Sequence, residues 1–185
     1  YKARDGIIYQ INLIDTPGHV DFNYEVSRSL SACEGALLVV DAGQGLQAQS
    51  LANVHLAEQR NLTIVPVINK IDLPTADVPA VIEQLEETLA FPRDEVLTCS
   101  AKSGIGIDEI LERAIAAIPP PAIPQSNVLQ ALIFDSQYDL YRGVMVYIRV
   151  ISGSIKKGSN VKLMSSDTIY EVLEVGVFTP KQLPV

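Results

Sequence analysis

Five consecutive residues, Asp15-Thr16-Pro17-Gly18-His19, combine the groups that phosphate chemistry requires. A carboxylate such as that of Asp15 can hold Mg²⁺ through water, and the backbone N–H of Gly18 can meet a terminal phosphate. His19 can orient a water for attack on phosphorus. The motif therefore predicts phosphoryl transfer, with a tight turn that holds a structural histidine as the alternative reading of these residues alone.

A second polar motif, Asn69-Lys70-Ile71-Asp72, has the groups to bind a guanine base. The carboxylate of Asp72 can accept hydrogen bonds from the N1 and N2 edge of guanine, Asn69 can hold the Hoogsteen side, and the stem of Lys70 can lie under the ring. Adenine would leave that carboxylate unpaired, so the motif indicates guanine. A polar turn before Pro74 is the alternative.

A third motif, Ser100-Ala101-Lys102, can present a backbone N–H to guanine O6, although a tripeptide alone is a weak signal. Each of the three motifs follows a predicted strand. The carboxyl ends of parallel strands meet at one edge of a sheet. We therefore expect Asp15, Asn69 and Asp41, which follows a further strand, to belong to one site.

The predicted elements are those of an α/β fold with a mostly parallel sheet covered on both faces. Apolar runs over 7–14, 36–40, 63–68 and 95–99 predict strands. Helical spacing is expected over 22–33, 48–60, 78–89 and 107–118. The turn Arg4-Asp5-Gly6 predicts that residues 1–14 form an antiparallel hairpin at the edge of that sheet.

Prolines at 119–121 and 124 end this alternation and predict a domain boundary. We expect an α/β domain over 1–118, a Pro-rich linker over 119–124, and an antiparallel β-barrel domain over 125–185 that is incomplete at its C-terminus. In the second part, alternation over 144–150 and strand-like runs around Val161, Leu163, Val172 and Val175 support the β assignment.

Composition narrows the functional classes. Fourteen basic and 22 acidic residues give a net charge of -8, which argues against loose electrostatic binding to nucleic acid by this segment. The longest apolar runs are too short to span a bilayer. Cys33 and Cys99 lie far apart and indicate neither a disulfide framework nor a metal knuckle, which fits a reducing compartment.

Taken together, the motifs resemble those of a known family. Residues 15–18, 69–72 and 100–102 resemble the third, fourth and fifth guanine-nucleotide motifs of P-loop GTPases, and His19 is typical of their translational branch. Further stretches resemble that branch over nearly the whole chain: 18–22, 24–30, 32–42, 66–74, 100–110, 134–136, 141–144 and 153–158.

The resemblance implies a GTP-binding domain followed by a β-barrel of the translation-factor domain II type. It implies a ribosome-binding GTPase that acts in elongation, uses GTP and Mg²⁺, forms GDP and phosphate, and contacts rRNA and ribosomal proteins but not DNA. By similarity, residues 15–19 would line the phosphate side, with Gly18 at the γ-phosphate, Asp15 in the magnesium shell and His19 at the hydrolytic water. Residues 69, 70, 72 and 100–102 would bind the base.

One part of the family pattern is absent from these 185 residues, because no G-x-x-x-x-G-K-S/T phosphate loop occurs in them. We therefore expect the family's first strand and phosphate loop to be missing, and this piece to bind GTP poorly and hydrolyse it negligibly while its parent chain is active. Asn23 and Gly43 stand where serine is more usual, outside the chemistry.

Two other functional readings stay open at this point: another branch of translational GTPases, and a non-catalytic interaction module that has lost the phosphate loop. We expect a cytoplasmic protein. Peripheral association with the cytoplasmic face of the inner membrane and an organellar origin are both left open.

Overall fold

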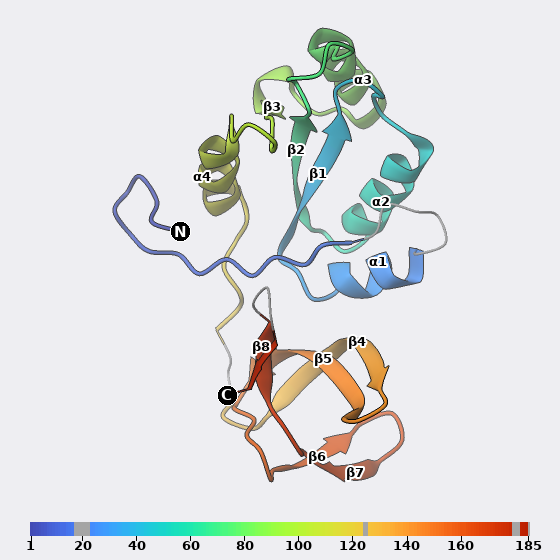
Figure 1. The fold of residues 1–185 in the computed structure, drawn as a ribbon, viewed down its shortest axis with the longest axis vertical. Coiled ribbons are helices and arrows are strands. Elements are labelled where there is room, and N and C mark those ends of the chain that lie inside the picture. The colour runs from blue at the N-terminus through green and yellow to red at the C-terminus, as the bar shows by residue number, and fades with distance from the viewer. Residues whose placement is uncertain (17–22, 124–125, 179–181, 185) are drawn as a thin grey trace.

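The first part of the chain is built on a three-stranded parallel sheet (Figure 1). The structure is a computed structural model that describes residues 1–16, 23–123, 126–178 and 182–184. The strands are β1 (Gly35–Asp41), β2 (Thr63–Asn69) and β3 (Leu97–Thr98), in that spatial order. The runs predicted over 36–40 and 63–68 are therefore confirmed, whereas the run over 95–99 contains only a short strand.

Four helices connect and flank these strands: α1 (Asn23–Leu30), α2 (Ala48–Glu58), α3 (Val78–Leu89) and α4 (Ile107–Ala117). A short 3-10 helix, η2 (Arg93–Glu95), precedes β3. The boundaries of α3 have clear causes. Asp77 accepts a hydrogen bond from the N–H of Ala80 at 3.1 Å and caps its start, and Ala90 turns left-handed at φ 56° and ends it.

Helices cover both faces of the sheet, as predicted (Figure 1). On one face, Leu38, Val40 and Ile68 form a buried cluster with Val54 of α2 and Leu85 of α3. On the other face a second buried cluster combines strand and α4 residues: Val65, Val67, Cys99 and Ile110. Neighbouring residues of β2 thus point to opposite faces, as a buried central strand requires.

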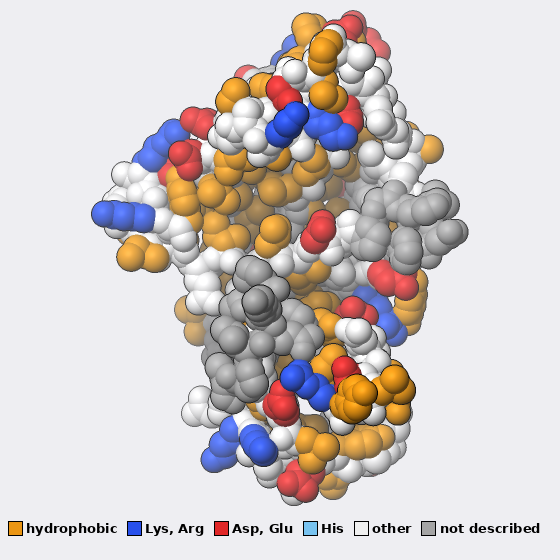
Figure 2. All heavy atoms as spheres, viewed as in Figure 1, with side chains coloured by type: hydrophobic (Ala, Val, Ile, Leu, Met, Phe, Trp, Pro, Cys, Tyr) orange, Lys and Arg blue, Asp and Glu red, His pale blue; other side chains and the backbone are white. Residues whose placement is uncertain are grey.

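Part of β1 stays uncovered on the α4 side. Leu37 and Val39 are 37% and 55% exposed. Figure 2 shows hydrophobic side chains gathered over the middle of this first part of the chain on the viewed face.

Among the described residues, no helix has both the length and the apolar character that crossing a bilayer demands.

The strand predicted over 7–14 is wrong. Residues 1–9 form a small hairpin instead, with a Lys2–Ile8 bridge and a hydrogen bond from the N–H of Ala3 to the carbonyl of Ile7 at 2.9 Å. This hairpin contacts α4 through an Arg4–Glu109 ion pair of 3.1 Å, rather than the sheet edge. The first half of the run forms its backbone hydrogen bonds within this hairpin. Residues 10–14 have no strand partner among the described residues.

The second part consists of three antiparallel pairs in the described residues. They are β4 (Gln130–Asp139) with β5 (Gly143–Ser152), β6 (Asn160–Leu163) with β7 (Thr168–Glu171), and β8 (Gly176–Phe178) with β9 (Gln182–Pro184). The structure therefore supports antiparallel β structure, and the described residues do not form a closed barrel. Val172 and Val175 lie between β7 and β8 rather than in strands.

Arg149 of β5 joins two units of the chain: the α/β unit, which contains β1 to β3, and the β unit, which contains β4 to β9. Its guanidinium donates a hydrogen bond to the carbonyl oxygen of Ala32 at 2.8 Å and forms an ion pair with Glu34, both in the segment between α1 and β1. The side chains of Arg149 and Glu34 are both largely buried, at 23% and 26% exposed.

Candidate functional site

The guanine-side motifs meet at the carboxyl ends of β2 and β3. They line a cavity of about 300 Å³ together with one apolar neighbour: Asn69, Lys70, Asp72, Leu73, Ala101 and Lys102. β2 is parallel to its two neighbours and leads directly into Asn69, which explains why residues 30 positions apart meet here. The structure thus brings together the residues of the second and third motifs.

The side-chain oxygen of Asn69 organises one wall of the cavity. It accepts hydrogen bonds from the backbone N–H groups of Lys70 at 2.7 Å and Ala101 at 3.0 Å, and the Sγ of Cys99 lies at 3.4 Å. These donors fix the orientation of the amide. Its Nδ2 has no acceptor among the described residues, so two N–H donors remain for a ligand.

Ser100 fixes the carboxylate of Asp72. The Ser100 hydroxyl donates to Asp72 Oδ1 at 2.6 Å, and Ser100 itself is fully buried. Reciprocal backbone hydrogen bonds with Ile105, of 3.0 and 3.2 Å, hold Ser100 in place. The hydroxyl lowers the pKa of Asp72, so the carboxylate stays ionised as an acceptor. No other described side chain donates to it.

One backbone N–H of the third motif already has an acceptor. Residues 100–102 are expected to present a backbone N–H to guanine O6, and that of Ala101 donates to Asn69 Oδ1 in this structure. An incoming carbonyl oxygen at this point would compete with Asn69 for the same donor. The contact of the Ser100 hydroxyl with Asp72 could not be predicted from the sequence, because a tripeptide motif does not show which way a buried side chain points.

Lys70 has an unusual backbone and a specific partner. Its φ is +66°, in the left-handed region that side chains other than glycine adopt infrequently and that is enriched at functional sites. Its Nζ lies 2.6 Å from Asp41 Oδ2 at the end of β1. The Lys70 ammonium and the Gly43 N–H lower the pKa of Asp41.

The structure does not bring Asp15 and Thr16, the described residues of the phosphate side, to this cavity. Asp15 and Thr16 lie in an extended segment outside any strand, and Asp15 is exposed. In Figure 1 this blue segment crosses the view near the starting end of β1, away from the arrowheads of β1 and β2. Pro17, Gly18 and His19 lie outside the described residues.

The described residues hold no group of three or more His, Cys, Asp or Glu side chains that could bind a metal ion. A magnesium site built on Asp15 would therefore consist of one carboxylate, water and ligand oxygens, a donor set that Mg²⁺ accepts readily. By their chemistry, the described residues of the cavity fit a guanine base. For Mg²⁺, Asp15 is the one described residue of the first motif that offers a carboxylate.

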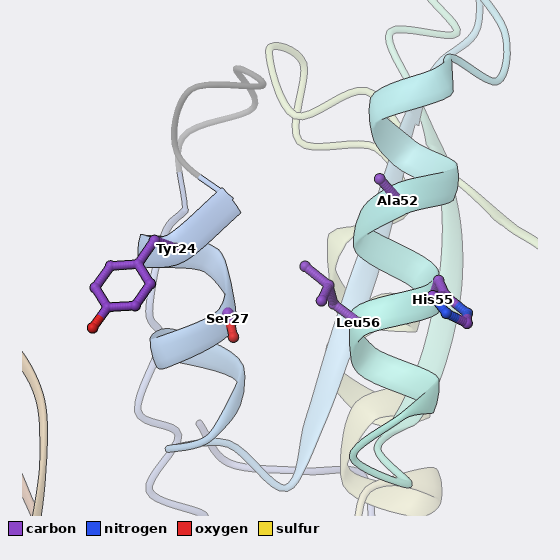
Figure 3. A pocket seen from close by; sticks show the side chains of 5 residues that line it. All are labelled: Tyr24, Ser27, Ala52, His55 and Leu56. Carbon is purple, nitrogen blue, oxygen red and sulfur yellow. The ribbon is translucent and has the colours of Figure 1, made fainter.

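A second, wider cavity lies between α1 and α2 (Figure 3). It measures about 490 Å³ and is lined by Tyr24, Ser27, Ala52, His55 and Leu56. Leu56 points from α2 towards α1, whereas His55 points away from α1. The Tyr24 hydroxyl accepts a hydrogen bond from Arg28 at 2.7 Å, and the described residues of the three motifs are not among those that line this cavity.

Comparison with known proteins places this geometry in context. A family model described as the elongation factor Tu GTP binding domain matches residues 5–120. Over 185 residues the chain is 66% identical to elongation factor 4 of Protochlamydia amoebophila (strain UWE25), covering 100% of this chain and 31% of that protein.

Two further relatives have similar identities. The chain is 55% identical to elongation factor 4 of Onion yellows phytoplasma (strain OY-M), covering 99% of this chain and 30% of that protein. It is 56% identical to a protein of Phaeodactylum tricornutum (strain CCAP 1055/1) named translation factor GUF1 homolog, mitochondrial, covering 100% and 27%. The chain therefore spans about three tenths of the length of the curated relatives it matches.

Proposed function

Because this chain belongs to the family of the elongation factor Tu GTP-binding domain, we propose that it supplies the guanine-binding part of a translational GTPase of the elongation factor 4, or LepA, type. The names of the relatives support this branch, which residues 27–35 already indicate by their sequence. They do not favour the alternatives, a GTPase of the BipA or EF-G type or a non-catalytic module.

The observation that carries the proposal is the arrangement of Asn69, Asp72 and Ser100. The Asp72 carboxylate, held by Ser100 and kept ionised, can accept two N–H groups from one edge of a base. The free Nδ2 of Asn69 can donate to an acceptor on the other edge. Guanine offers this combination, and adenine would leave the carboxylate without a donor.

On the phosphate side, GTP with Mg²⁺ supplies the reacting phosphoryl group and the cation that neutralises its charge. Asp15 would hold the magnesium shell through water, and the N–H of Gly18 would donate to the terminal phosphate. Thr16 and Pro17 would shape the turn between them. His19 would orient the attacking water as the catalytic residue, giving GDP and phosphate.

The partners follow from this proposal. The full protein would act on the ribosome, in contact with rRNA and ribosomal proteins, and exchange GTP and GDP without binding DNA. Bacterial and mitochondrial names among the relatives support a cytoplasmic or organellar location. We also propose that the full protein associates peripherally with the cytoplasmic face of the inner membrane.

GTP hydrolysis by the full-length protein, with and without ribosomes, tests this function. We expect ribosomes to stimulate hydrolysis of GTP but not of ATP. His19→Ala should abolish the stimulated rate and leave the Kd for GDP unchanged, whereas Asp72→Asn should weaken GDP binding itself. Equal rates with ATP and GTP, or a His19→Ala protein as active as the wild type, would contradict the proposal.

The 185-residue chain alone should bind GTP weakly, because the G-x-x-x-x-G-K-S/T loop that carries much of the phosphate affinity is not in its sequence. Equilibrium titration with a fluorescent GTP analogue measures this. Binding with a Kd of about 1 μM or tighter, which corresponds to about 8 kcal/mol, would contradict this expectation.

A further inference from the structure

Asp41 is held in a fixed orientation beside the guanine-side cavity. Its Oδ1 accepts the N–H of Gly43 at 2.8 Å, and its backbone carbonyl accepts the N–H of Gly45 at 2.9 Å. In the β1–β2 register Asp41 stands opposite Asn69, and the Ala42 N–H donates to the Asn69 carbonyl at 2.9 Å. Oδ2 is thereby left pointing at the neighbouring strand end, where Lys70 lies.

Lys70 is constrained at both ends. Its backbone N–H is bound to Asn69 Oδ1 in the left-handed conformation, and its Nζ lies 2.6 Å from Asp41 Oδ2. Lys70 lines the cavity, and its alkyl stem runs between these two contacts. A lysine held only by water would spread over many rotamers, and ordering it on binding would cost conformational entropy.

The pair is unlike an ordinary surface ion pair. The side chain of Asp41 is 17% exposed and that of Lys70 is 53% exposed, so the acceptor is mostly buried while the donor side chain remains open to a ligand. An ion pair whose lysine is this exposed adds little to the stability of the fold. Its effect on the orientation of the lysine stem is larger, because the Gly43 N–H holds the other oxygen of the Asp41 carboxylate.

We propose that Asp41 is a positioning residue of the guanine site, which holds the ammonium of Lys70 so that its alkyl stem forms the wall against which the base packs. The inference rests on the proposed function and deepens it, because it adds a residue outside the three motifs to the determinants of base binding. Asp41 acts through Lys70 and does not touch the base.

A double-mutant cycle in the full-length protein tests this. Asp41→Asn keeps an oxygen for the Gly43 N–H and removes the charge, and Lys70→Met keeps an alkyl stem and removes the ammonium. The readout is the Kd for fluorescent GDP. We expect Asp41→Asn to weaken binding about five- to tenfold, as loss of one charge-assisted contact does. In the Lys70→Met background the same change should have no further effect.

Asp167→Asn is the matched control, because Asp167 pairs with Lys162 at 2.8 Å in the β6–β7 hairpin, away from the cavity. It should leave the Kd unchanged. An unchanged Kd for Asp41→Asn, or an equal loss with and without the Lys70 ammonium, overturns the inference while the proposed function stands. Failure of the wild type to bind any guanine nucleotide overturns both.

A second measurement needs no variant. NMR relaxation of lysine ε-methylene groups in the GDP-bound wild type should show Lys70 ordered and the exposed Lys156 mobile. Equal mobility of the two groups would overturn the inference even if Asp41→Asn failed to fold.

Discussion

At the scale of single residues, the proposed function makes Asp72 the side chain that selects the base. Asp72→Asn replaces one acceptor oxygen by an N–H₂ donor, which faces the N2 amine of guanine and cannot accept from it. We expect the full-length variant to lose about 2–3 kcal/mol of GDP binding, roughly 30- to 150-fold in Kd. Xanthosine diphosphate, which carries a carbonyl in place of that amine, should bind the variant better than GDP does.

Competition titrations with both nucleotides measure this exchange of preference. Asp94→Asn, the same substitution at an exposed residue of η2, is the control and should leave the Kd for GDP unchanged. A variant at position 72 that keeps the wild-type ratio of GDP to xanthosine diphosphate affinity would show that Asp72 does not read the base.

Ser100 sets the ionisation of Asp72. Removing its hydroxyl in Ser100→Ala should raise the pKa of Asp72 towards the ordinary aspartate value of about 3.9. Because the folded-state pKa is lowered, this contact stabilises the fold above the ordinary pKa, and its contribution disappears as the pH falls through the lowered value. The stability difference between wild type and Ser100→Ala should therefore shrink in acid.

Carbon-detected NMR titration of the Asp72 carboxyl group measures the shift directly. Ser103→Ala is the control, because the hydrogen bond of Ser103 to Ser100 uses its backbone N–H, at 3.3 Å, and its side chain is exposed. Identical Asp72 titration curves in wild type and Ser100→Ala would contradict the role assigned to the hydroxyl.

At the scale of elements, the sequence predicts those parts whose signals are local. The helical spacing of Val78, Ile82, Leu85 and Leu89 predicts a helix over 78–89, which are the bounds of α3. The run over 7–14 has equally strong apolar character, yet a strand also requires a hydrogen-bonded neighbour, which composition cannot supply. The ladder of β4 with β5 is set by pairing between distant residues, and β4 was not predicted as a strand.

The candidate site also has parts that the sequence predicts and parts that it does not. Asn69, Asp72 and Ser100 are recognisable from their motifs because each follows a strand of one sheet. The contact of Lys70 with Asp41, and that of Arg149 with Glu34, join residues with no common motif. Such contacts depend on strand register and on the docking of units, so only the three-dimensional arrangement reveals them.

Leu85 is the residue at which α3 depends most on the sheet. It is fully buried in the cluster that contains Ile68, the residue before Asn69. Leu85→Ala should lower the free energy of unfolding of the first unit by about 2–5 kcal/mol, through lost burial and the cavity left behind. Urea unfolding followed by NMR signals of β2 measures the loss.

Leu140→Ala makes the same chemical change at a side chain that is 84% exposed, in the turn between β4 and β5. It should change stability by less than about 0.5 kcal/mol. Similar losses from both substitutions would contradict the packing described for α3.

At the scale of the whole molecule, Arg149 couples the β unit to the α/β unit. It contacts Ala32 and Glu34, which follow α1, and α1 in turn follows the 15–19 motif in the sequence. The guanidinium meets both a carbonyl and a carboxylate, so its planar fork fixes direction as well as distance. The β unit is therefore attached at the segment that joins the phosphate-side motif to the sheet.

Arg149→Ala removes both contacts and leaves the largely buried carboxylate of Glu34 without this partner. We expect the two units to tumble separately, so that ¹⁵N relaxation gives two rotational correlation times in place of one. Arg142→Ala, whose ion pair with Glu174 stays inside the β unit, should retain the single value. The exchange Glu34→Arg with Arg149→Glu should restore much of the common tumbling, because the opposite charges again face each other. Undiminished common tumbling in Arg149→Ala would mean that other contacts between the units hold them together, and that Arg149 is not the residue on which their docking depends.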